Sequence, residues 1–194
     1  NTMKKFLKLA SAAAVASIAL AGGALAEDPP KLAWSMTAAG TSDYIFRGFS
    51  QTREDPAFQL SFDATYGIFY AGVWGSNIDF DAANAFKENV EIDFYAGITP
   101  SVGSVTFDLG VLYYYYPGVS DFALGGEADY VELKAGAKTT LMEKLALAGT
   151  VYWTPDNFGE TGSVVTLEGS ANYTLGTFGI FTPTIGGTIG TALA

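Results

Sequence analysis

The chain has 194 residues with 20 acidic and 10 basic side chains, and it contains neither cysteine nor histidine. Without these two residue types the chain has no disulfide bonds to stabilise it, no Ser-His-Asp or Cys-His catalysis, and no zinc site of the usual kind. The acidic excess repels nucleic acid and attracts cations, so a nucleic-acid partner is not expected.

Residues 1–26 have the order of a secretory signal peptide. Lys4, Lys5 and Lys8 precede an apolar run, and the small-residue stretch AGGALA follows it. We therefore expect removal of this segment, export of the mature chain, and one domain over residues 27–194. A retained N-terminal membrane anchor is the alternative.

The mature chain alternates between apolar and polar residues with a period of two, which is typical of β-strands with two different faces. From Phe58 to Tyr66, for example, the even positions are apolar or aromatic and the odd positions are polar. The pattern predicts nine strands, over residues 33–47, 57–66, 68–79, 88–99, 104–116, 127–139, 145–154, 163–175 and 179–190.

The connections between these strands alternate between long loops and tight turns. This asymmetry is typical of bacterial outer-membrane barrels, so we expect the all-β class and a transmembrane up-and-down antiparallel β-barrel. Such barrels have an even number of strands, so nine visible strands predict ten or twelve in an intact chain and a C-terminal truncation here. Loops are expected near residues 48–56, 80–87, 117–126 and 155–162, and turns at Gly67, PSVG, 140–144 and GTFG.

Alternation alone also fits a soluble lipocalin-like barrel, whose apolar face lies inside. Aromatic residues gather near both ends of the predicted strands, and this favours the membrane barrel, which carries two aromatic girdles on its lipid-facing side. Tyr44 and Phe46 are expected on that outward side, at the end of the first strand. The predicted girdle is Tyr44, Phe46, Tyr113, Tyr115 and Trp153 toward the long loops, with Tyr66, Tyr173 and Phe181 toward the short turns. The same clusters at the strand ends also contain Tyr114, Tyr116, Tyr130, Tyr152 and Phe178.

One stretch of the sequence resembles a known family. SDYIFRGFSQT, followed by DPAFQLSFD and YAGVWGSNIDF, is similar to the N-terminal signature of the TorF family of outer-membrane porins, over Ser42 to Phe80. The resemblance implies a porin in the bacterial outer membrane without established catalytic residues. The sequence departs from such barrels at its end, GTIGTALA, where they usually carry a terminal aromatic residue.

The polar positions of the alternating strands are expected to line the lumen, and they carry eight acidic and three basic side chains. Rings of carboxylates favour cations. We therefore predict a porin-like channel for passive diffusion of small solutes or ions, with a modest cation preference and outer-membrane lipid around it. The lumen residues expected are Asp43, Arg47, Asp63, Asp79, Glu91, Asp93, Asp108, Glu132, Lys134, Lys138 and Glu168.

Two other functions compete with the channel. The first is a closed barrel that acts structurally or through its loops, with Arg47 and the lysines pairing carboxylates across a narrow lumen. The second is a membrane-embedded enzyme that uses a carboxylate pair such as Glu91 and Asp93. Spacing of two recurs on any alternating strand, so we predict no enzyme activity, no cofactor and no metal site.

Overall fold

The computed structural model describes residues 30–80, 89–117, 128–179 and 181–194. The predicted signal peptide lies outside these residues, and so do most of the predicted loops at 80–87 and 117–126. No helix in the described ranges is long and apolar enough to cross a membrane.

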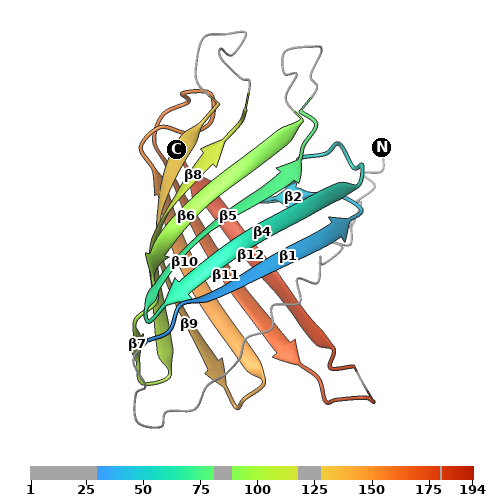
Figure 1. The fold of residues 1–194 in the computed structure, drawn as a ribbon, viewed down its shortest axis with the longest axis vertical. Coiled ribbons are helices and arrows are strands. Elements are labelled where there is room, and N and C mark those ends of the chain that lie inside the picture. Colours follow the sequence, from blue (N-terminus) through green and yellow to red (C-terminus); the bar gives the residue numbers. More distant parts are fainter. Residues whose placement is uncertain (1–29, 81–88, 118–127, 180) are drawn as a thin grey trace, which may run out of the picture.

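The described chain forms strands joined by loops and turns (Figure 1). The strands are β1 (Ala33–Thr41), β2 (Ile45–Phe46), β3 (Phe49–Ser50), β4 (Ala57–Tyr66), β5 (Phe69–Asn77), β6 (Val90–Ile98), β7 (Ser101–Val102), β8 (Val105–Tyr115), β9 (Tyr130–Leu141), β10 (Leu145–Thr154), β11 (Val164–Thr174) and β12 (Thr184–Leu193).

One antiparallel sheet of ten strands contains all of these except β2 and β3. Its order is β1-β4-β5-β6-β8-β9-β10-β11-β12, with the short β7 paired to β8. Each long strand therefore pairs with the long strands before and after it in the chain, and the predicted all-β meander with nine long strands is confirmed.

The sheet curls but does not close into a barrel. Among the described residues, β1 and β12 are its two edges and do not contact each other. In the view of Figure 1, β11 and β12 cross behind β1 and β4, so the sheet bends back over its own inner face. The predicted closure is thus absent from the structure, whereas the predicted strand order is present.

Tight turns join the strands at one end of the sheet. Gly67, Gly103 and Gly179 have φ values of 60°, 60° and 63° there. Glycine adopts positive φ without a steric penalty, which is why it suits short connections between antiparallel strands. The predicted turns at Gly67, PSVG and GTFG are confirmed.

The alternating apolar and polar positions of each strand lie on opposite faces of the sheet. On β6, Val90 and Phe94 are 44% and 48% exposed, whereas Glu91 and Asp93 are 2% and 8% exposed. The same apolar parity is exposed on β4, β8, β9 and β10. The apolar face is therefore outside and the polar face inside, which is the reverse of a lipocalin-like barrel.

The first strand ends earlier than predicted. β1 stops at Thr41, whose Oγ1 donates to the carbonyl oxygen of Asp43 at 2.8 Å. Hydroxyl groups that bond nearby backbone in this way favour turns over strand continuation. β2 and β3 then pair with each other as a separate hairpin.

Tyr44 and Phe46 consequently do not lie on the exposed face, and their predicted outward position is wrong. The ring of Tyr44 lies 5.3 Å from that of Trp74, and the ring of Phe46 lies 5.9 Å from that of Tyr114. Both pack against a buried cluster on the inner side of the sheet. The physical reason is the β2–β3 hairpin, which turns this segment inward instead of continuing β1.

Candidate functional site

The β2–β3 hairpin (residues 45–50) carries Arg47, whose side chain bonds residues of the inner face. Its two-residue turn consists of Arg47 and Gly48, with φ values of 48° and 89°. Positive φ at both positions is the type I′ pattern, whose twist matches that of paired antiparallel strands. At the base of the hairpin, Asp43 Oδ1 accepts hydrogen bonds from Ser50 Oγ at 2.6 Å and Thr52 Oγ1 at 3.0 Å.

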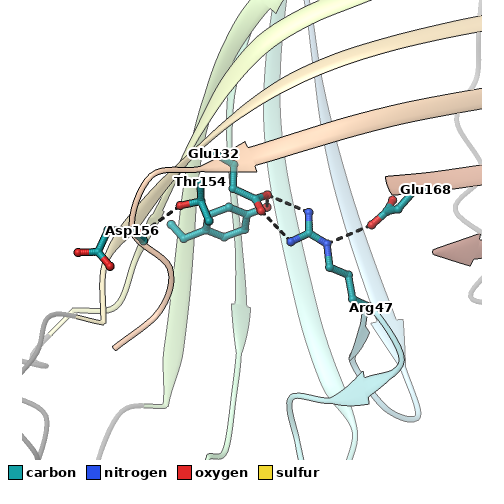
Figure 2. A network of polar contacts seen from close by, with 6 residues as sticks. Arg47, Glu132, Thr154, Asp156 and Glu168 are labelled. Atoms are coloured by element: carbon teal, nitrogen blue, oxygen red, sulfur yellow. Dashed lines mark hydrogen bonds and ion pairs between the residues drawn. The ribbon is translucent and has the colours of Figure 1, made fainter. Parts of the chain in front are cut away.

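Arg47 joins the hairpin to the strands β9 and β11 (Figure 2). Its Nη1 and Nη2 donate to Oε1 and Oε2 of Glu132 on β9 at 2.7 and 2.9 Å. Its Nε donates to Oε1 of Glu168 on β11 at 3.1 Å. Two parallel bonds between guanidinium and carboxylate combine charge with fixed geometry, so this contact sets the position of the hairpin.

The surroundings of Arg47 keep it charged. Burial lowers the pKa of the guanidinium. The hydrogen bond to Glu132 and the negative charge of Glu132 raise the pKa and outweigh the effect of burial, so the pKa of Arg47 lies above its ordinary value. The guanidinium carbon also lies 4.7 Å from the ring centres of Phe46 and Tyr152. Cation–π contacts of this kind add to the ion pair.

A second charged group lies on the inner face of β8 and β9. Lys134 Nζ is 2.8 Å from Oδ2 of Asp108, and Tyr70 Oη donates to Oδ1 of the same carboxylate at 2.8 Å. Tyr70 reaches Asp108 across Gly97 and Gly110, where a side chain would collide with its hydroxyl. These glycines permit close approach on a crowded inner face.

A third group has no basic partner among the residues that the structure describes. On β6, Glu91 Oε1 accepts a hydrogen bond from Tyr44 Oη at 3.0 Å. Asp93, two residues further along, is buried, and its Oδ1 has no hydrogen-bond partner within the described part of the chain. A buried polar atom without a partner is uncommon and calls for an explanation.

A cavity of about 1350 Å³ lies between the β2–β3 hairpin and the strands β8 to β12. Its lining includes Arg47, Asp93 and Glu168 together with the aromatic rings of Tyr114, Tyr130 and Tyr152. We call this space the central cavity. It combines aromatic walls with fixed charges, which is the usual composition of a binding site for a small molecule.

The remaining predicted lumen residues lie at separate places in the structure. Asp63 is on the inner face of β4 and accepts hydrogen bonds from Tyr95 and Ser61. Lys138 is exposed and lines a smaller cavity of about 390 Å³ that Asn172 also lines. Asp79 lies beyond the end of β5, with its Oδ2 at 3.7 Å from Nη1 of Arg53.

The predicted girdle is divided between the two faces. Tyr44 and Phe46 are on the inner face, as described above. The other members are exposed: Tyr66, Tyr113, Tyr115, Trp153, Tyr173 and Phe181.

Several tyrosines of the inner face were not predicted to line the lumen. Tyr114, Tyr130 and Tyr152, which were expected with the aromatic residues at the strand ends, line the central cavity, and Tyr70 and Tyr95 donate hydrogen bonds to Asp108 and Asp63. On two strands the alternation gives the signal, because Tyr95 alternates in step with Glu91 and Asp93 on β6, and Tyr114 with Asp108 on β8. No group of three or more histidine, cysteine, aspartate or glutamate side chains suited to a metal ion occurs in the described residues.

Comparison with known proteins supports one assignment. The model of a bacterial protein family of unknown function, Gcw_chp, matches residues 26–192. The chain belongs to the Gcw_chp family. Neither a curated protein nor a solved structure gives a significant match. The family description of Gcw_chp names no activity.

Proposed function

We propose that this protein is an outer-membrane β-barrel that acts as a porin-like channel for small solutes or ions, with a modest preference for cations. The observation that carries the proposal is the inverted distribution of residues, with apolar side chains outside and carboxylates inside. Soluble monomeric proteins rarely expose contiguous apolar patches above a few hundred Å². Lipid is the surrounding in which such a face is stable.

The exposed aromatic residues fit the same proposal. Tyr113, Tyr115 and Trp153 lie near the ends of strands that lead into the longer loops, and Tyr66 and Tyr173 lie near the tight turns. Two aromatic bands at the two interfaces are a property of membrane barrels. The TorF resemblance of Ser42 to Phe80 favours the same class of protein.

Membrane insertion also requires closure of the sheet. In hydrocarbon, each unpaired backbone group costs several kcal/mol, so open sheet edges do not occur there. We therefore expect the edges of β1 and β12 to be paired in the membrane, either with each other or with further strands. The inner face would then surround a lumen, and its acidic excess would favour cations.

A closed barrel with a structural role is the second candidate, and the contacts of Arg47 favour it. One guanidinium bonds Glu132 and Glu168 from a hairpin that lies over the inner face. Such a bridge would narrow the lumen considerably, since barrels of about eight strands have interiors that side chains nearly fill. In the channel proposal, the same hairpin forms a constriction that leaves a path beside it through the central cavity.

Planar-bilayer recording separates the two candidates. The protein would be refolded in detergent and added to a bilayer under a salt gradient. We expect stepwise conductance and a reversal potential whose sign favours cations, because the inner face is acidic. A folded, heat-modifiable protein that remains electrically silent would contradict the channel and support the closed barrel.

A further inference from the structure

We propose that the central cavity binds a small organic cation, with its ammonium group at Asp93 and its apolar part against the surrounding tyrosine rings. This inference rests on the proposed function in one respect, namely that the polar inner face surrounds an interior that a ligand can enter from one end, whether or not ions pass through. It adds a ligand class and a binding residue to a channel that would otherwise discriminate by charge alone.

The first argument is the pairing of charges on the inner face. Arg47 bonds Glu132 and Glu168, and Lys134 pairs with Asp108. Asp93 is 8% exposed and has an oxygen with no hydrogen-bond partner among the described residues. Burying a carboxylate without a partner is costly, so a cation bound there would supply the interaction that the chain itself lacks.

The second argument is the aromatic wall beside this carboxylate. Asp93 pairs with Trp74 on β5 and with Tyr114 on β8, so both rings project from the same face next to it. Tyr114 in turn stacks on Tyr130, with ring centres 4.3 Å apart and planes at 12°. Faces of tyrosine and tryptophan attract ammonium and guanidinium groups.

The same type of cation recognition already occurs within the chain, at Arg47. The guanidinium of Arg47 lies 4.7 Å from the ring centre of Tyr152, another tyrosine of the central cavity, while it bonds Glu132. A carboxylate and an aromatic ring from two residues thus hold one cation together. Asp93 lines the same cavity together with Tyr130 and Tyr152, and its Oδ1 has no hydrogen-bond partner among the described residues.

The composition of the cavity favours an organic cation over a metal ion. Calcium takes six to eight oxygen ligands and magnesium a near-octahedral set. No cluster of acidic residues in the described chain is suited to a metal ion, and the walls beside Asp93 are aromatic. A volume of about 1350 Å³ also leaves room for an apolar body attached to the charge.

Choline and its uncharged isostere 3,3-dimethylbutanol test the proposal without any substitution. Isothermal titration calorimetry on the refolded full chain in detergent is expected to show saturable binding of choline. The isostere is expected to bind about tenfold more weakly or not at all, because it lacks the charge that the carboxylate and the rings recognise. Equal affinity for the two compounds, or no binding of choline, would overturn the inference.

A variant assigns the site to its residue. Asp93→Asn keeps the shape and removes the charge, so it is expected to weaken choline binding about tenfold. Glu143→Gln serves as the matched control, because it removes one carboxylate from an exposed turn and should leave the affinity unchanged. Choline binding that survives Asp93→Asn undiminished would contradict the assignment.

Recording from the same preparation distinguishes the two proposals. Cation-selective conductance without choline binding overturns the organic-cation site and leaves the channel standing. Choline binding that depends on Asp93, in a protein that stays electrically silent, overturns the channel and supports the site.

Discussion

Replacing Arg47 by alanine is expected to lower the free energy of unfolding by about 3–5 kcal/mol, because it leaves a buried carboxylate without its partner. That carboxylate is Glu132, whose side chain is 2% exposed. The same change releases the hairpin from β9 and β11, so the single-channel conductance is expected to rise. Urea unfolding in detergent measures the first effect, and bilayer recording measures the second.

Arg53→Ala is the matched control for this experiment. Arg53 is 56% exposed, and its Nη1 lies 3.7 Å from Asp79 Oδ2. Exposed pairs contribute about 0–1 kcal/mol, so the control should unfold nearly as the wild type does. An Arg47→Ala protein of unchanged stability and conductance would mean that the bridge to Glu132 and Glu168 neither holds the hairpin nor narrows the lumen.

Neutralising Glu91 and Asp93 together, as Glu91→Gln with Asp93→Asn, is expected to reduce the cation preference of the channel. In an aqueous lumen, a carboxylate about 8 Å from a cation attracts it by about 0.5 kcal/mol. Two such groups therefore change cation occupancy by about fivefold. The reversal potential under a salt gradient should move toward zero by a corresponding amount.

The control for this double variant removes the same charge from the exposed surface, as Glu143→Gln with Glu160→Gln. Both residues are exposed and lie in connections between strands. If the control shifts the reversal potential as much as Glu91→Gln with Asp93→Asn does, the preference arises from overall charge and not from the inner face. If Glu91→Gln with Asp93→Asn loses stability without any change of conductance, the closed barrel is favoured.

The strands were predictable because each one has two chemically different faces. The predicted ranges 57–66 and 145–154 coincide with β4 and β10 at both ends. A strand with apolar residues on one side and polar residues on the other has a sequence in which the two kinds alternate with a period of two. Glycine marks several of the tight turns for an equally local reason, since positive φ suits it.

The hairpin was not predicted because the alternation continues through it. Tyr44 and Phe46 keep the parity of the preceding strand, so the segment reads as its extension. Two local signals indicate the break. Gly48 follows Arg47 between two phenylalanines, as in a two-residue hairpin turn. Asp43 lies within a few residues of hydroxyl side chains that bond its carboxylate.

The closed-barrel alternative predicted that Arg47 and the lysines pair with carboxylates, but the sequence did not indicate which carboxylates. Arg47 and Glu132 are 85 residues apart in the chain, and their contact depends on how far the sheet curls. Tyrosine occurs on both faces of β8, where Tyr113 is exposed and Tyr114 is buried. Composition alone therefore does not separate girdle residues from residues of the central cavity.

Tryptophan quenching tests most directly whether the apolar face meets lipid and the polar face lines the interior. The chain has three tryptophans. Trp34 and Trp153 lie on the exposed face, whereas Trp74 packs on the inner face against Tyr44. Each of three variants would keep one tryptophan, replace the other two by phenylalanine, and be reconstituted in vesicles of brominated lipid.

Brominated acyl chains are expected to quench Trp34 and Trp153 strongly and Trp74 weakly. Quenching falls off over short distances, so contact with lipid decides the outcome. Equal quenching of all three, or protection of Trp34 and Trp153 with quenching of Trp74, would contradict the proposed orientation and the channel that depends on it.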